Sequence, residues 1–418
     1  MMERLFLRIK SNSKINVLLS IALILSLCAY VFSIPMFSAL PKLNLISYAL
    51  MAATAFIVFL KYFFYEKFVF NRRLLILLIF AIEAFIGTAF YSHDFRHWFT
   101  IVLLVVELFV FYYAFSAIGN RKWILRIISY GLFGFALYFA YYYRSDLLKF
   151  NLDKPLGTDF DNVNTVGTYF SLGSALFLYL ALTSKRWFEW VHIIPCVVML
   201  VLGFFTGSRH YIITTGAAFL TTMMVAFRKR KWLAPLLFAI AIGLLIVVIQ
   251  IPSLAFLKER IDRGISTIFG TGNAKYDPSA VQRFIWPRYG FNIGSRVLLF
   301  GYGAEGFSIY SGIGTYSHNT YSEIICNFGL LGCLIFFFAL LYPLILTIRS
   351  HDRRINITYV IVVFYLVKGF FGVYFASKDT YIMIALMLFL TKDIKLGEYV
   401  GLRKANALNN NQYCEVKI

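Results

Sequence analysis

Three side chains between residues 209 and 318 have the chemistry to act on a phosphorylated substrate: Arg209, Arg283 and His318. A guanidinium group grips phosphate through two parallel hydrogen bonds, which an ammonium group cannot do. The imidazole of His has an unperturbed pKa near neutrality, which suits proton transfer. Each residue also has an ordinary explanation, since an interfacial Arg can extend to lipid headgroups and a lone His is commonly a structural residue.

The residues around these three side chains indicate how they are positioned. Arg283 and Arg288 flank Trp286, a pattern typical of an amphipathic helix that lies on a membrane with its Arg side chains at the headgroups. His318 closes a long polar segment and is followed by Asn319, directly before an apolar run. A Gly-Ser pair precedes Arg209 and allows a sharp turn at the end of another apolar run.

The composition requires a membrane around these residues. The chain is 60% hydrophobic, 19% aromatic and only 14% charged, whereas an ordinary globular domain is about 25% charged. Its 45 Phe and 28 Tyr residues are more than a soluble protein of this length can bury. We therefore expect an all-α polytopic membrane protein, with residues 1–418 forming a single integral membrane domain.

Apolar runs near the ~20 residues that cross a bilayer predict about twelve transmembrane helices. They are expected at residues 15–38, 43–60, 74–91, 98–117, 124–143, 165–183, 191–206, 210–227, 233–251, 319–347, 357–375 and 380–391.

The net charge of +20 reports topology rather than a nucleic-acid partner, because most of the 40 Lys and Arg residues fall in short clusters between these runs. This is the positive-inside pattern, and it predicts that both termini lie in the cytoplasm. Two segments on the outer side are too long for simple turns: a shorter periplasmic loop at 144–164 and a long one at 252–317, which is rich in Arg. The long loop is either a solvated surface or a site for an anionic ligand.

Four ionisable residues are predicted inside the spans: Glu83, Glu107, Glu323 and Lys368. Such groups are costly in a bilayer and usually face the interior of the bundle. They are expected to form interhelical pairs, with Glu323 a possible partner of the long loop, although a proton pathway in a transporter would also use them.

Asp159 and Asp161 resemble the pair with which many nucleotide-sugar glycosyltransferases hold a divalent metal. In the predicted topology this pair lies on the outer side, where nucleotide sugars are not supplied. Capping of the next helix by Asp161 or Asn164 is the better explanation. We therefore expect no metal and no cofactor.

Taken together, these segments resemble the O-antigen ligase and O-antigen polymerase superfamily. The pair His318-Asn319, nine residues and then 329–332 resemble its HN-x9-GxxG signature, and 206–209 resembles its outer-face Arg motif. Arg283, Trp286 and 301–303 resemble its long periplasmic loop. Residues 160–164 resemble its Asn-containing segment before a mid-chain helix, although Val163 stands where the family usually has Pro.

The resemblance implies a GT-C-like, metal-independent glycosyltransferase in the bacterial inner membrane, with its active site facing the periplasm. The implied substrate is an oligosaccharide linked to undecaprenyl diphosphate, and the implied partners are membrane lipids, chain-length regulators and flippases, but no nucleic acid. Arg209 and Arg283 would neutralise the diphosphate and His318 would deprotonate the acceptor hydroxyl. Arg288, Asn319 and Asn164 would help to bind substrate.

The expected activity is that of an O-antigen polymerase in lipopolysaccharide biosynthesis, which adds a glycan to the non-reducing end of the next lipid-linked repeat unit. The closest alternative is a ligase that transfers the glycan to lipid A-core. A polysaccharide flippase or other transporter is a third candidate, but such proteins often have two similar halves. The Arg-rich segment 252–317 has no counterpart in the first half of this chain.

Overall fold

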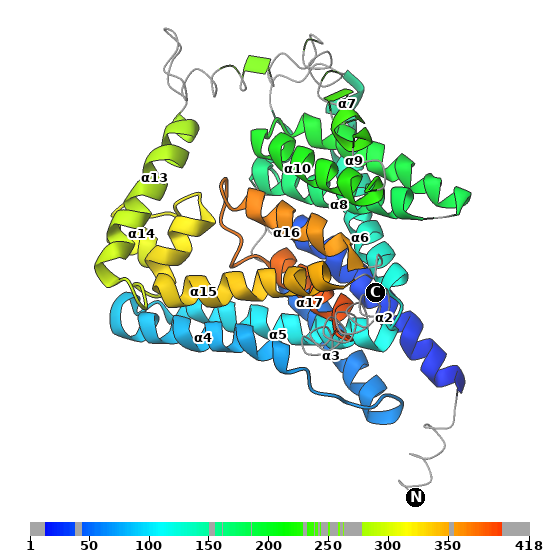
Figure 1. Cartoon of the computed structure of the whole chain (residues 1–418), viewed down its shortest axis with the longest axis horizontal. Helices are drawn as coiled ribbons and strands as arrows, with labels where there is room; N and C mark the ends of the chain where they lie inside the picture. The colour runs from blue at the N-terminus through cyan, green and yellow to red at the C-terminus, as the bar shows by residue number, and fades with distance from the viewer. Residues whose placement is uncertain are drawn as a thin grey trace, which may run out of the picture.

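The computed structural model describes residues 13–37, 44–149, 155–160, 162–184, 186–228, 232–237, 239–240, 243, 250, 258–259, 262, 278–350 and 355–394. Within these ranges every regular element is a helix and there is no strand (Figure 1). The predicted all-α polytopic fold is confirmed. A helix satisfies its own backbone polar groups, which is what a segment in lipid requires.

Eight helical segments are long and apolar enough to cross a membrane, and each coincides with a predicted span. They are α2 (Ser13–Phe37), α3 (Asn44–Phe64), α4 (Leu75–Gly87) with its flanking turns η1 (Arg72–Leu74) and η2 (Thr88–Ser92), α5 (Phe95–Ile118), α6 (Arg121–Tyr142), α8 (Val163–Thr183), η3 (Trp187–His192) with α9 (Ile193–Phe205), and α15 (Thr320–Arg349).

Three other predicted spans also contain helices: α10 (Arg209–Ala226), α16 (Ile357–Lys368) and α17 (Lys378–Leu390). The last two are shorter than the ~20 residues of a full crossing. The predicted span 233–251 lies largely outside the described residues.

The prediction of one continuous helix over 357–375 was wrong, because α16 ends at Lys368. The Gly369 carbonyl accepts a hydrogen bond from the Thr320 backbone N–H at 2.8 Å, and the Gly372 carbonyl accepts one from the Thr320 hydroxyl at 2.7 Å. These carbonyls satisfy the first residue of α15, so the chain after α16 forms a turn rather than more helix.

The described part of the long loop predicted at 252–317 is largely helical. It contains α13 (Pro278–Gly294), η5 (Ser295–Val297) and α14 (Gly306–Tyr310). Helix α13 crosses one end of the bundle at a steep angle to α15 (Figure 1). Two of its glycines, Gly290 and Gly294, let its backbone approach Ser322 and Cys326 of α15. The helix predicted around Trp286 is therefore present, and it packs on the spans.

The described part of the shorter loop predicted at 144–164 also packs against the bundle. It contains α7 (Arg144–Lys149), and the Leu156 backbone N–H donates to the Phe205 carbonyl at 3.0 Å. The Tyr143 hydroxyl donates to Asp159 at 2.7 Å.

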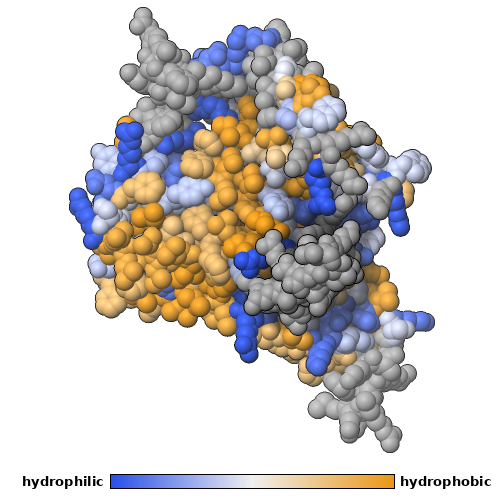
Figure 2. Space-filling view, in the orientation of Figure 1, coloured by the Kyte–Doolittle hydropathy of each residue, from blue (hydrophilic) through white to orange (hydrophobic). Residues whose placement is uncertain are grey.

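Helix α8 lies at the centre of the molecule, between α6, α9, α10 and α16. Apolar or small residues occupy all its faces, as expected for a helix surrounded by protein. Gly167 lets Tyr211 of α10 approach closely. On the outside, the surface over α4 and α15 is hydrophobic and hydrophilic side chains gather at its margins (Figure 2).

The segments that carry the predicted cytoplasmic charges meet at the other end of the bundle from α13. Arg73, before α4, donates to the backbone carbonyl of Thr391 at 2.7 Å, just after α17. Lys122 and Arg126 of α6 both bind the carboxylate of Glu189. The alternating direction of the helices therefore agrees with the predicted order of inner and outer connections.

Candidate functional site

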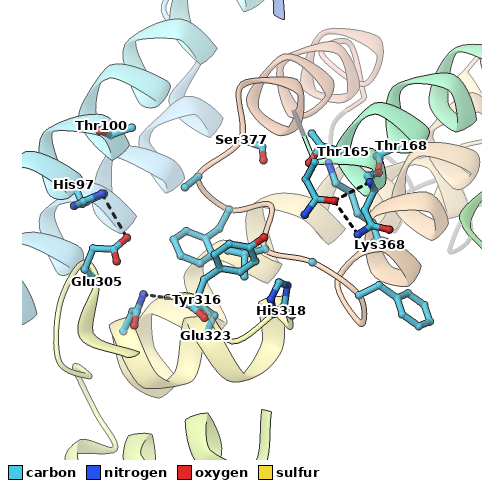
Figure 3. A pocket seen from close by; sticks show the side chains of 18 of the residues that line it. His97, Thr100, Thr165, Thr168, Glu305, Tyr316, His318, Glu323, Lys368 and Ser377 are labelled. Atoms are coloured by element: carbon cyan, nitrogen blue, oxygen red, sulfur yellow. Dashed lines mark hydrogen bonds and ion pairs between the residues drawn. The ribbon is translucent and has the colours of Figure 1, made fainter. Parts of the chain in front are cut away.

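A cavity of about 270 Å³ opens at the end of the bundle next to α13 and α14 (Figure 3). Its wall is built from the first residues of α5, α8, α10 and α15, from the last residue of α16, and from the connections at 304–305, 316–318 and 371–377. Several of these segments begin or end a helix, where backbone groups and polar side chains are exposed. The cavity thus combines polar side chains and helix ends with apolar residues such as Phe371 and Phe375.

His318 lies in the wall of this cavity and is held firmly. Its backbone has a left-handed conformation, with φ of 58°, which is uncommon for a residue other than glycine. The hydrogen bonds on either side explain how it persists. The Ser317 backbone N–H donates to Glu323 at 2.6 Å, and the Asn319 side chain caps α15 by accepting from the Ser322 N–H at 3.1 Å.

Two aromatic rings fix the plane of the His318 imidazole. The indole of Trp286 stacks on it with ring centroids 5.3 Å apart and an angle of 22°, and the Tyr316 ring lies 4.3 Å away. Trp286 comes from α13, so the long outer segment and the start of α15 jointly orient this side chain.

Burial and the positive charge of Arg283 lower the pKa of His318 to about 4. Both factors disfavour the imidazolium form, burial by desolvation and Arg283 by repulsion between like charges. His318 is therefore neutral near pH 7, with a ring nitrogen able to accept a proton.

Arg283 lies one helical turn before Trp286, on the same side of α13. It interacts electrostatically with both His210 and His318, which are in the cavity wall. The structure thus brings together two of the three residues predicted to be catalytic. Neither Arg283 nor Arg288, which is also on α13, is among the residues of the wall, and Arg288 is exposed.

Arg209 is the first residue of α10 and is half-buried. The preceding residue, Ser208, caps this helix and donates a hydrogen bond from its hydroxyl to the Asn164 side chain at 2.8 Å. Asn164 lies in the cavity wall, whereas Arg209 is beside it and outside the wall. Asn319, also predicted to bind substrate, is buried and serves as the cap of α15.

Residues 194–337 match the protein-family model described as O-antigen ligase. The match supports a relationship between this segment and the O-antigen polymerase and ligase superfamily. No curated protein matches the chain. The matched residues cover about a third of the sequence and include Arg209, Arg283 and His318. The superfamily supports a glycosyltransferase-like membrane enzyme that acts on lipid-linked polysaccharide.

The superfamily signature at 329–332 has a structural explanation in this chain. Gly329 adopts a non-helical conformation inside α15, with φ of 61° and ψ of −164°. The backbone N–H groups of Leu330 and Leu331 donate to the Leu298 and Leu299 carbonyls at 2.7 and 3.2 Å. A side chain at Gly329 would overlap Leu299. The motif therefore joins the chain after α13 to α15, the helix that begins just after His318.

Lys368 in the wall belongs to a buried interhelical pair, a role predicted for it from the sequence. Its ammonium group donates to Asp379 of α17 at 2.8 Å, and the Tyr365 hydroxyl donates to the same carboxylate oxygen at 2.8 Å. The charge of Lys368 is thus paired with Asp379, on the side of the cavity opposite Glu305 and His97 (Figure 3).

Sequence reasoning missed His97, His210 and Glu305 in the cavity wall. His210 directly follows Arg209, so the motif at 206–209 could have pointed to it. The other two are brought together only by the fold, because more than two hundred residues separate them in the sequence.

The structure describes only one of the two carboxylates at 159 and 161. Asp159 accepts the hydrogen bond from Tyr143, while Asp161 lies outside the described residues. The cap of α8 is Asn162, which accepts from the Asn164 backbone N–H at 2.9 Å, so the prediction of Asp161 or Asn164 as the cap was wrong. In the described ranges, no group of three or more His, Cys, Asp or Glu side chains has the arrangement of a metal site.

Proposed function

We propose that this protein is a surface-polysaccharide polymerase of the O-antigen type. It would transfer a glycan from undecaprenyl diphosphate to the non-reducing end of a second lipid-linked repeat unit. The cavity would face the periplasm from the inner membrane, in agreement with the positive-inside topology. Chain-length regulators and flippases would be its partners.

His318 would act as the general base of this reaction. It would take the proton of the acceptor hydroxyl, whose oxygen would attack the anomeric carbon of the donor glycan as the bond to the diphosphate breaks. Arg283 and Arg209 would stabilise the charge that develops on the departing diphosphate. Because the lipid diphosphate carries the driving force, neither a metal nor a cofactor is proposed.

The observation that carries this proposal is the neutral imidazole of His318 in the cavity wall, within the field of Arg283. This combination joins a proton acceptor to a phosphate-binding cation, which are the two groups that glycan transfer from a lipid diphosphate needs. Arg288, Asn319 and Asn164 are proposed to assist in substrate binding, and Asn164 has the most direct support because it lies in the wall.

A ligase that transfers the finished glycan to lipid A-core is the second candidate, since the matching family model is described as O-antigen ligase. A gel of surface lipopolysaccharide from cells lacking the protein separates the two. Core bearing a single repeat unit would identify the polymerase, whereas bare core would identify the ligase. An unchanged ladder of lipopolysaccharide bands would contradict both candidates and favour a transporter instead.

The roles of the site residues are tested by substitution in these cells. His318→Ala should reduce glycan transfer by about 10²–10⁴-fold, the usual contribution of a general base. Arg283→Lys should also transfer poorly, because a point charge does not replace a bidentate group. Arg296→Lys, an exposed substitution in the same outer segment, is the matched control and should remain active. Full transfer by both His318→Ala and Arg283→Ala would exclude this mechanism.

A further inference from the structure

The cavity wall contains two carboxylates, Glu305 and Glu323, whose surroundings differ. Glu323 is buried and accepts hydrogen bonds from the Ser317 N–H at 2.6 Å and from the Asn327 amide at 3.5 Å. Glu305 is more than a third exposed, and within the described part of the chain no donor lies at hydrogen-bonding distance from its carboxylate. Of these two groups, Glu305 is the one with acceptor capacity left for a ligand.

The backbone that carries Glu305 is tightly fixed. Three consecutive N–H groups before it are bonded to neighbouring helices: Tyr302 to the Cys326 carbonyl at 2.9 Å, Gly303 to the Asn327 carbonyl at 2.6 Å, and Ala304 to the Thr88 hydroxyl at 2.9 Å. Glu305 itself has a left-handed φ of 58°. Strained conformations of this kind persist only where the surroundings impose them, and they cluster at ligand sites.

A second carboxylate and an imidazole stand behind Glu305. Asp94 caps α5 and binds Nδ1 of His97 at 2.8 Å, while Nε2 of His97 lies 3.6 Å from the Glu305 carboxylate. The His97 ring therefore points at Glu305 from outside hydrogen-bonding distance. As an imidazolium, with Nδ1 donating to Asp94, His97 would attract the Glu305 carboxylate from this distance without using up its hydrogen-bonding capacity (Figure 3).

Aromatic rings lie close to the 302–310 segment that carries Glu305, and one further ring, Tyr316, is in the cavity wall. Tyr302 stacks on Tyr310 with centroids 4.1 Å apart, and Tyr91 packs edge-on against Tyr302. Tyr310, Tyr91 and Tyr316 remain substantially exposed. Pyranose rings pack their apolar faces against exposed aromatic rings, while carboxylates accept their hydroxyl groups, so this surface has the chemistry of a sugar site.

We infer that Glu305, oriented by His97 and Asp94, forms the binding subsite for the acceptor glycan. This inference rests on the proposed function and adds to it the location of the second substrate. A carboxylate repels a diphosphate and attracts sugar hydroxyls, whereas the guanidinium of Arg283 attracts a diphosphate. The two substrates would thus approach from opposite sides and meet at His318, which lies between Glu305 and Lys368 in Figure 3.

The test measures the binding of each substrate half separately, with the full-length protein in lipid nanodiscs. One probe is the repeat-unit oligosaccharide released by mild acid from the lipid carrier of cells lacking this protein. The other is farnesyl diphosphate, which has the diphosphate and no sugar. Glu305→Gln should weaken oligosaccharide binding by at least about tenfold, the value of a hydrogen bond to a charged group. Its farnesyl diphosphate affinity should change by less than about twofold, well below that value.

Two further variants serve as controls for this interpretation. Glu305→Asn should have the same effect as Glu305→Gln, and Asn tolerates the left-handed backbone better than most residues do. Glu66→Gln, an exposed carboxamide substitution at the other end of the bundle, is the matched control and should bind both probes normally.

The outcomes for the two proposals are distinct. The inference is overturned if the unsubstituted protein does not bind the oligosaccharide, if the Glu305 variants bind it normally, or if they lose both probes equally. The proposed function fails instead if farnesyl diphosphate does not bind, or if Arg283→Gln leaves its affinity unchanged. Neither of those two results would change the conclusion drawn from the oligosaccharide measurement.

Discussion

His318 is neutral for two physical reasons that respond differently to a ligand. Its burial is a property of the fold, since Trp286 and Tyr316 cover the ring. The repulsion by Arg283 is electrostatic, so an anion brought near that side chain would change it. A diphosphate bound at Arg283 would oppose that charge and raise the pKa of His318, which would make it a stronger base when the donor is in place.

The titration of His318 should reveal the Arg283 charge directly. As the pH falls, the imidazole should take up its proton only near its pKa of about 4, below the ordinary 6.5. In Arg283→Gln the midpoint should move to higher pH and stay below 6.5, because burial persists. The measurement is ¹³C NMR of ring-labelled His, with His318→Gln to assign the signal.

The exposed Arg296→Gln serves as the control for this titration and should leave the midpoint unchanged. A midpoint near 6.5 in the unsubstituted protein would show that His318 is neither buried nor repelled as described. A midpoint that Arg283→Gln does not raise would remove the electrostatic link between the two residues.

At the scale of elements, the site depends on how the outer segment is joined to α4 and α15. The 301–306 backbone lies between these helices and hydrogen-bonds to Thr88 on one side and to Cys326 and Asn327 on the other. These hydrogen bonds fix the position of Glu305, and the residues that follow it continue to His318.

Gly303→Ala should disrupt these hydrogen bonds and destabilise the protein more than a matched glycine substitution in the same segment. Gly303 has φ of 83°, and a Cβ there would overlap the backbone of Gly87 and Thr88. Gly312 has a similar φ of 70° with open space around it. Both variants should lose about 1 kcal/mol from backbone strain, and Gly303→Ala should lose roughly 1–3 kcal/mol more from overpacking.

The midpoint of thermal inactivation of the purified protein measures this difference, together with glycan transfer by the variants. Gly303→Ala should have the lower midpoint and little activity, whereas Gly312→Ala should stay close to the unsubstituted protein. Equal effects of the two substitutions would mean that the close approach to Thr88 contributes nothing.

The positions of the helices were predictable because a bilayer imposes long apolar runs, which are readable without tertiary contacts. The end of α16 was not, since it depends on hydrogen bonds from Thr320, far away in the sequence. The same distinction holds at the site. Motif spacing and residue chemistry pointed to His318 and Arg283, but the approach of His97 to Glu305 exists only in the folded chain.

At the scale of the whole molecule, the two ends of the bundle have different characters. One end holds the cavity with α13 and α14 beside it. The other collects basic residues before α4 and in α6, which bind backbone carbonyls after α17 and the Glu189 carboxylate. The positive-inside rule assigns the basic end to the cytoplasm, so the cavity end should face outward.

Single cysteines placed at the two ends test this orientation. Ser295→Cys in η5 and Glu66→Cys after α3 are both exposed substitutions, one at each end. In intact spheroplasts a membrane-impermeant maleimide should label Ser295→Cys, and it should label Glu66→Cys only after permeabilisation. The unsubstituted protein, with its own five cysteines, supplies the background. The reverse labelling would turn the cavity toward the cytoplasm, where a periplasmic glycan could not reach His318, and the proposed polymerase would have to be abandoned.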